Sequence, residues 1–204
     1  MHKFVKRLVI CLMVAIVFWT LGLIADRKFL SDNLIRLHVV ANSDSSADQN
    51  IKLRIKDAVL ESIQSDLQEV TDISHAKEYL QGNLAKIQNI VVKTLEELGV
   101  QESAIVTFGR EAFDIRHYET FSLPAGVYHS LRIVIGDGLG KNWWCVAFPT
   151  LCLPATADDF HIVAADAGMS ANLSATLSDR NNHQFRFYFL EKLGHLQCSV
   201  LDGK

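Results

Sequence analysis

Ile35–Asp57 reads IRLHVVANSDSSADQNIKLRIKD, and its apolar period changes halfway along. Apolar side chains first alternate with Arg36 and His38, and this period of two predicts a half-buried strand over residues 33–41. After a polar break, apolar side chains recur at helical spacing and predict a helix to about Asp66. A strand followed by an amphipathic helix is typical of domains in which helices cover a sheet.

Two long helices are predicted between this strand and the rest of the chain. Ser46 precedes Gln49 by three residues, which is the spacing of a capping box at a helix start. A second helical pattern runs from about Ser74 to Leu98. Gly99 suits the end of that helix, because glycine adopts a left-handed conformation at little cost.

The apolar period returns to two after residue 99. Strands are predicted over residues 104–108, near 113–116, over 131–135 and over 143–148, with a glycine turn at Gly136–Gly140. Consecutive strands joined by short turns favour antiparallel pairing. The predicted fold class is therefore α+β: a mostly antiparallel sheet in the order strand–helix–helix–strands, with two long helices on one face, an N-terminal hydrophobic helix and a C-terminal helical tail.

The N-terminal segment Met1–Arg7 is basic, and the run Leu8–Ala25 that follows has 18 residues and no charge. This pattern is typical of an export signal, and the run is just long enough to be an uncleaved membrane anchor. Ala25 suits a cleavage site, but Leu23 is bulky where a small residue is preferred, and Thr20 with Gly22 offers a second pair of better size. Because basic residues stay cytoplasmic, we expect export machinery to place the rest of the chain outside the cytoplasm, whether or not the segment is cleaved.

The chain has 204 residues, of which 49% are hydrophobic and 21% charged, with a formal net charge of −3. This is an ordinary globular composition, and the lack of a basic surplus argues against a nucleic-acid partner. We divide the chain into an export signal or anchor over 1–28, an α+β domain over 29–154 and a weakly defined extension over 155–204. Residues 155–178 are small and polar and predict a loose or weakly helical connector, and a helix is predicted near 184–197.

No catalytic motif is present in the sequence. The glycine run before Lys141 lacks the spacing of a phosphate-binding loop, so a turn between strands is the better interpretation. His117 and His129 could converge with Asp114 as a metal or acid–base site, although scattered histidines more often lie at the surface or in structural hydrogen bonds. We therefore expect no cofactor, no metal and no small-molecule substrate.

Cys145 and Cys152 have six residues between them. A disulfide between the two is a candidate in an exported domain, and buried free thiols or a metal pair are the alternatives.

Trp143 and Trp144 are neighbours in a predicted strand, so their side chains point to opposite faces. We expect one in the core and the other on the surface, where tryptophan is a frequent binding anchor. The alternative is that both are buried beneath a helix.

Two stretches of the sequence resemble the stage II sporulation protein R family of endospore-forming bacteria. The matching residues of the first stretch are Ile35–Ser45, Asp48, Gln49 and Asp57–Val59. Those of the second stretch are Leu123–Gly126, Tyr128, Leu131, Arg132, Gly136, Gly138, Gly140, Asn142–Val146, Phe148, Pro149, Leu151 and Cys152. The resemblance covers residues 1–154, Thr150 stands where a second proline is expected, and residues 155–204 match weakly.

The resemblance implies a signalling protein rather than an enzyme. It implies that the chain is made in the forespore and exported to the space between the septal membranes. There it would activate a membrane-embedded aspartic protease of the mother cell, which processes a pro-sigma factor. The residues we expect at the partner contact are Arg36, His38, Lys141, Asn142, Trp143 and Trp144. The alternative function is an exported envelope hydrolase that uses His117, His129 and Asp114, or Cys145.

Overall fold

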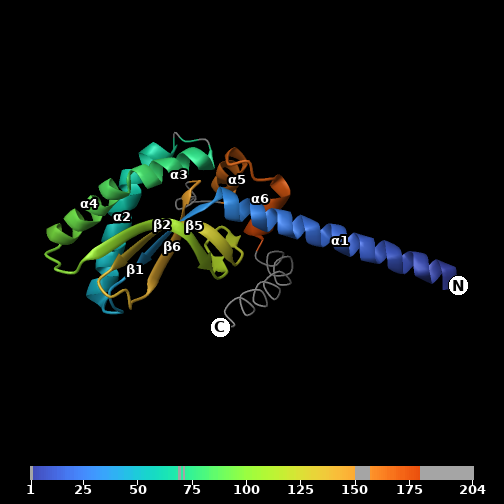
Figure 1. Cartoon of the computed structure of the whole chain (residues 1–204), viewed down its shortest axis with the longest axis horizontal. Coiled ribbons are helices and arrows are strands. Elements are labelled where there is room, and N and C mark those ends of the chain that lie inside the picture. Colours follow the sequence, from blue (N-terminus) through green and yellow to red (C-terminus); the bar gives the residue numbers. More distant parts are fainter. Residues whose placement is uncertain (1, 69, 71, 150–156, 180–204) are drawn as a thin grey trace.

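The computed structural model describes residues 2–68, 70, 72–149 and 157–179. Its helices are α1 (His2–Asn33), α2 (Ser46–Gln68), α3 (Ile73–Gly82), α4 (Leu84–Glu97), α5 (Ala157–Asp166) and α6 (Ala171–Ser178). Its strands are β1 (Ile35–Val40), β2 (Ala104–Phe113), β3 (Arg116–His117), β4 (Ser122–Leu123), β5 (Gly126–Ile135) and β6 (Asn142–Phe148). Figure 1 shows α1 extending as a long arm from a domain in which α2, α3 and α4 lie over the sheet.

The main sheet has the strand order β2-β5-β1-β6 within the described part of the chain. β1 pairs antiparallel with β6 and parallel with β5, and β5 pairs antiparallel with β2. The predicted α+β fold with a mostly antiparallel sheet is confirmed. The parallel pair joins strands separated by α2, α3, α4 and β2, which is a connection long enough for a crossover. The strands predicted at 104–108 and near 113 are one strand, β2.

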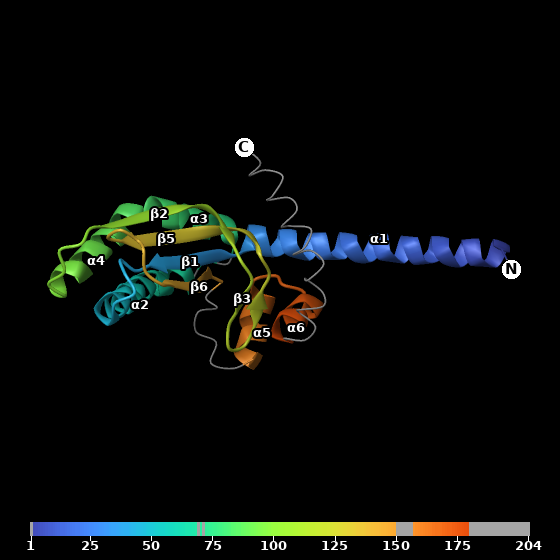
Figure 2. The ribbon, with the colours of Figure 1, turned by 90° about the horizontal axis from the view of Figure 1, so that it is seen from below.

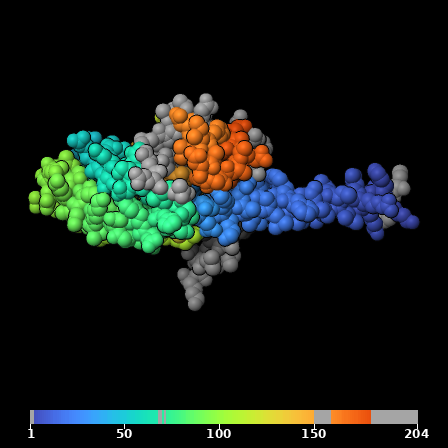
Figure 3. All heavy atoms as spheres, turned by 90° about the horizontal axis from the view of Figure 1, so that it is seen from above, coloured from blue at the N-terminus to red at the C-terminus, as the bar shows by residue number. Residues whose placement is uncertain are grey.

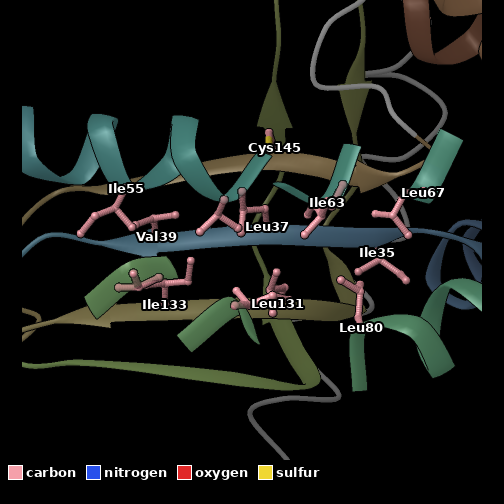
Figure 4. Packing of buried hydrophobic residues seen from close by; sticks show 14 of the residues in the cluster. Ile35, Leu37, Val39, Ile55, Ile63, Leu67, Leu80, Leu131, Ile133 and Cys145 are labelled. Atoms are coloured by element: carbon pink, nitrogen blue, oxygen red, sulfur yellow. The ribbon is translucent and has the colours of Figure 1, made fainter. Parts of the chain in front are cut away.

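The first hydrophobic core lies between the sheet and the helices on one face. Figure 4 shows Leu37 and Val39 of β1 beside Leu131 and Ile133 of β5, and all four side chains are fully buried. The residues of α2 that pack into this core recur about every four positions and are Ile55, Val59, Ile63 and Leu67. Full burial of one such side chain contributes roughly 1.5–3 kcal/mol, so this layer holds the helices on the sheet.

β1 is buried on both faces, so the predicted half-buried strand is wrong. Arg36 is 0% exposed and His38 only 7%. A second hydrophobic cluster covers this other face, and its members come from the end of α1 and from β4, α5 and α6 among other elements. The sequence around β1 could not show this, because the covering residues come from distant parts of the chain.

The second cluster gives residues 157–178 more structure than the predicted loose or weakly helical connector. Phe160 of α5 and Leu173 and Leu177 of α6 are buried at 0–2% exposure. Figures 2 and 3 show α5 and α6 packed beside the inner end of α1. The helix predicted near 184–197 lies outside the described residues.

The long helix predicted over 74–98 is interrupted and forms α3 and α4. The backbone N–H and the side-chain amide of Asn83 both donate to the Tyr79 carbonyl oxygen, at 3.0 and 2.8 Å, and this ends α3. Gly99 ends α4 as predicted, with a φ of 68°. The N–H of Val100 then donates to the carbonyl of Leu95 at 2.9 Å, which completes a Schellman-type C-terminus.

α2 begins at Ser46 as predicted, but a different residue caps it. The Oγ of Ser45 accepts a hydrogen bond from the Asp48 N–H at 3.1 Å. The side-chain amide of Gln49 donates to the carbonyl of Ser43 at 2.8 Å instead of reaching back to Ser46. The predicted capping box therefore does not form, because Ser45 caps the helix and its own N–H donates to Oγ of Ser43 at 3.1 Å.

Candidate recognition site

The Gly136–Gly140 turn between β5 and β6 is held against the loop that follows β1. The N–H of Leu139 donates to the backbone oxygen of Asn42 at 3.0 Å. The N–H of Asp137 donates to the side-chain oxygen of the same asparagine at 2.9 Å. Because β1 begins directly after α1, the turn lies at the end of β1 farthest from α1.

Two glycines of this turn leave no room for a side chain. A Cβ at Gly140 would lie 2.2 Å from the backbone oxygen of Ser43, and a Cβ at Gly136 would lie 2.2 Å from Oδ1 of Asn42. Gly136 also has a φ of 55°, which favours glycine. The glycines are therefore required for the close contact between turn and loop, in agreement with the interpretation as a structural turn.

Lys141, directly after the turn, is fixed through its backbone. Its N–H donates to Oδ1 of Asp44 at 2.7 Å, and its carbonyl accepts a hydrogen bond from Nζ of Lys52 at 2.9 Å. Lys52 is 5% exposed, and burial lowers its pKa more than the charge of Asp44 raises it. The side chain of Lys141 is exposed, so a rigid backbone carries a cationic group at the surface.

Exposed apolar side chains lie on either side of Lys141 in the sequence. Leu139 at the tip of the turn is 81% exposed, and Trp143 at the start of β6 is 38% exposed. The Nζ of Lys56 on α2 lies 4.9 Å from the centroid of the Trp143 ring, which is a cation–π contact. Leu139, Lys141 and Trp143 form what we call the distal tip.

Trp144 faces the other side of the sheet, as the alternation predicted. Its ring stacks on His38 with the centroids 5.6 Å apart, and the guanidinium carbon of Arg116 lies 3.5 Å from its centroid. Trp144 is half-buried. The expectation of one surface tryptophan is therefore confirmed by Trp143, whereas Trp144 is half-buried against the second cluster rather than in the core, and the alternative that both are buried is wrong.

His38 links the tryptophan face to the start of β6. Its Nδ1 lies 2.8 Å from Oε1 of Glu111, and its Nε2 lies 3.0 Å from Oδ1 of Asn142. Burial raises the pKa of Glu111, but its hydrogen bond with His38, together with smaller polar and charge contributions that include Arg132, outweighs burial and places that pKa below its ordinary value. His38 is therefore placed to position Asn142 rather than to meet a partner itself.

Arg36 is a fully buried cation in the second cluster. Its Nη2 donates to the hydroxyl of Tyr118 at 2.8 Å, and its guanidinium carbon lies 4.0 Å from the centroid of the Phe113 ring. Its Nε and Nη1 have no hydrogen-bond partner in the described parts of the chain. The predicted surface position of Arg36 is wrong, because the second cluster encloses it.

The residues of the alternative hydrolase site are not brought together. The Nε2 of His129 lies 3.4 Å from Nη1 of Arg110, whereas Nδ1 of His117 lies 2.8 Å from Oγ of Ser122, and Asp114 is exposed. Among the residues that the structure describes, no group of three or more His, Cys, Asp or Glu side chains is arranged to hold a metal. This geometry gives the hydrolase reading no support.

Cys145 is disulfide-bonded. Cys152 lies outside the described residues, so the pairing of these two cysteines stays a prediction.

The sequence reasoning missed the residues that support the site, which are Asn42, Lys56, Glu111 and Arg116. Asparagine is a common turn residue, but nothing in the sequence near Asn42 indicates its bond to Asp137 in a distant turn. The other three carry no local signal, since their contacts with Trp143, Trp144 and His38 depend on how distant strands and helices pack.

These features define a class of protein: an α+β domain joined to an exposed apolar N-terminal helix, with a rigid tip of apolar and cationic side chains. The chain belongs to the stage II sporulation protein R family, whose profile matches residues 31–158. This membership gives the chain a role in sporulation and confirms the resemblance drawn from its two sequence stretches.

The chain is also 39% identical over 123 residues to the stage II sporulation protein R of Bacillus subtilis (strain 168). The alignment covers 60% of this chain and 55% of that relative, so the chain matches about half the length of the relative. No solved structure matches the chain significantly.

Proposed function

We propose that this chain is an exported signalling protein of sporulation that activates a membrane-embedded aspartic protease of the mother cell. The activated protease would then process a pro-sigma factor. The chain would be exported from the forespore and act in the space between the septal membranes.

One observation carries this proposal beyond the family's role in sporulation. The molecule has an exposed apolar helix at one end of β1 and the distal tip at the other (Figure 1). The tip combines exposed Leu139 and Trp143 with the cationic Lys141, and aromatic and apolar anchors with flanking polar groups are typical of binding hot spots. A rigid tip held away from a membrane helix suits contact with another membrane protein.

We choose the residues that would contact the protease by the exposure of their side chains. We propose that Lys141 and Trp143 meet the protease directly, together with Leu139. Asn142 would be positioned by His38, and Trp144 would be held by Arg116 on the adjoining face. Arg36 would act only through the fold, because it is enclosed by the second cluster.

The test is reconstitution in a host that does not sporulate. The full-length chain, the protease and the pro-sigma factor are produced together, and the conversion of the pro-sigma factor is followed by immunoblotting. We expect conversion only when all three proteins are present, and none with a protease whose catalytic aspartates are replaced. An unprocessed pro-sigma factor, with all three proteins present and the chain exported, would contradict the proposal.

A matched pair of variants ties the result to the distal tip. Leu139→Ala should reduce conversion, whereas Ile105→Ala, which removes a side chain of 62% exposure from the edge strand β2, should not. Equal conversion by both variants would place the contact outside the tip.

A further inference from the structure

We propose that α1 is a retained membrane anchor whose last turns are part of the domain core, so the chain acts while attached to a membrane. The inference deepens the proposed function and rests on its export step. The sequence left open whether this segment is a cleaved signal or an anchor, and the packing of its C-terminal part decides between them.

The end of α1 is built into the second hydrophobic cluster. Leu23 is 1% exposed, and Leu30 and Leu34 are 0% and 1% exposed. They share the cluster with Tyr128 of β5 and Phe160 of α5. Leu23 and Leu30 lie on one side of α1, seven residues apart, and Leu34 follows the helix directly, with its N–H donating to the Leu30 carbonyl at 3.1 Å.

Polar contacts fix the same turns to the sheet. The Oγ of Ser31 donates to the carbonyl of Val127 and accepts a hydrogen bond from Nη2 of Arg110 at 2.7 Å. The Nζ of Lys77 on α3 donates to the backbone oxygen of Asp32 at 3.4 Å. The helix end is therefore tied to β2, β5 and α3, and it does not behave as a detachable leader.

The outer part of α1 has the opposite character. Its apolar side chains are exposed around the whole circumference, and a helix that is apolar all round is typical of a membrane span. The residues concerned, all 46–72% exposed, are Phe4, Val5, Leu8, Val9, Ile10, Leu12, Met13, Val14, Ile16, Val17, Phe18, Trp19, Leu21 and Ile24. In the described residues, the helix over Lys3–Asn33 is long and apolar enough to cross a membrane by length and composition.

The dimensions allow a short bilayer span. The part of the charge-free run that precedes the buried Leu23 is Leu8–Gly22, which has 15 residues, or about 22 Å at the helical rise, against a hydrocarbon core of about 30 Å, and local thinning of the bilayer accommodates a span of this length. Lys3, Lys6 and Arg7 precede it and can extend their charged ends to the cytoplasmic headgroups. Since Leu23 directly follows this span, the domain would sit directly against the outer surface of the membrane.

Leu23 belongs both to the apolar run of α1 and to the buried core of the domain. A cleavage site that ends at Ala25 prefers a small residue at position 23, and the structure explains the leucine there, because its side chain fills the second cluster. Cleavage after Ala25 would remove this leucine from the core. Cleavage after Gly22 would instead leave a charged amino group next to a buried side chain, which burial disfavours.

The first test determines the N-terminus of the exported chain. The full-length chain is exported in a bacterial host, and the membrane fraction is washed with alkaline carbonate and analysed by intact mass. We expect an uncleaved chain that stays with the membrane. A chain that lacks residues 1–22 or more, found in the soluble fraction, would overturn the proposal.

The second test compares two leucines that are two positions apart. In detergent, Leu23→Ala should lower the melting temperature of the domain, whereas Leu21→Ala, at 55% exposure, should leave it unchanged. Equal melting of both variants would show that α1 is not part of the core and would overturn the proposal.

Neither readout involves the protease. A retained chain that fails to trigger processing would contradict the proposed function and leave the anchor intact. A cleaved chain that still triggers processing would overturn the anchor proposal and leave the proposed function intact.

Discussion

Trp143 and Trp144 are neighbours in β6, yet their surroundings differ. Trp143 is 38% exposed and contacts Lys56 of α2, whereas Trp144 lies between His38 and Arg116. The alternation of a strand predicts the opposite faces. The depth of burial could not be predicted, because it depends on which helices cover each face.

We expect the two tryptophans to respond differently to truncation. Trp143→Ala should leave the melting temperature within a few degrees of the wild type, and should weaken partner binding by about 2 kcal/mol, or roughly 30-fold, if it is a contact anchor. Trp144→Ala should cost about 2 kcal/mol of stability, below the 3–5 kcal/mol of a core tryptophan, because it is half-buried. Thermal melting and the processing assay measure both effects, and equal destabilisation by the two variants would contradict this account.

Glu111 makes the folding stability depend on pH in the acidic range. Its pKa lies below the ordinary 4.5, since the hydrogen bond with His38 and smaller polar and charge contributions together outweigh burial. A carboxylate with a lowered pKa stabilises the fold above its unfolded pKa, and this contribution is lost as the pH falls through the folded pKa. We expect the wild type to lose stability below about pH 4.5.

The variant Glu111→Gln tests this dependence. It should be less stable than the wild type at pH 7 by about 1.5 kcal/mol, the value of a hydrogen bond to a charged group. Its melting temperature should fall less between pH 6 and pH 3. Parallel pH profiles for the two proteins would show that Glu111 does not carry the effect.

The burial of Arg36 could not be predicted from the sequence. An arginine that alternates with apolar residues is expected to face solvent, because a charged side chain is costly to bury. Here Phe113 and Tyr128 stack against the guanidinium and Tyr118 accepts its hydrogen bond, and none of these is near Arg36 in the sequence.

The β5–β6 turn is the element on which the distal tip depends. The turn itself was predictable from its glycines, but its contact with the loop after β1 was not, because that loop is distant in the sequence. The elements that deviate from prediction do so for similar reasons. Asn83 interrupts the second helix through a bond to Tyr79, and α5 and α6 fold against side chains of α1 and β4.

Gly140→Ala tests whether the turn needs its close approach to the loop. The new Cβ would lie 2.2 Å from the backbone oxygen of Ser43, so we expect a loss of about 2 kcal/mol or more and a melting temperature lower by at least about 4 °C. Gly109→Ala is the matched control, because no atom lies within 4 Å of its added Cβ. Equal melting of the two variants would mean that the turn is not locked.

Across the molecule, β1 lies between the two hydrophobic clusters and connects α1 with the distal tip. α1 leads directly into β1 at one end of the strand, and the distal tip lies at the other end (Figure 2). The strand, the two helical regions and the apolar N-terminus were predictable from their periods. The second cluster could not be predicted, because α5 and α6 are short and their apolar side chains are buried by packing against distant elements, among them α1.

The central claim is that the distal tip contacts the mother-cell protease, and site-specific cross-linking tests it most directly. A photoreactive amino acid is placed at position 139, 143 or 105 of the full-length chain, which is produced with the protease and the pro-sigma factor, and the products are examined after illumination. We expect covalent adducts with the protease from positions 139 and 143, none from position 105, and processed sigma factor in the same cells. Adducts from position 105 alone, or processing without any adduct from the tip, would contradict the account.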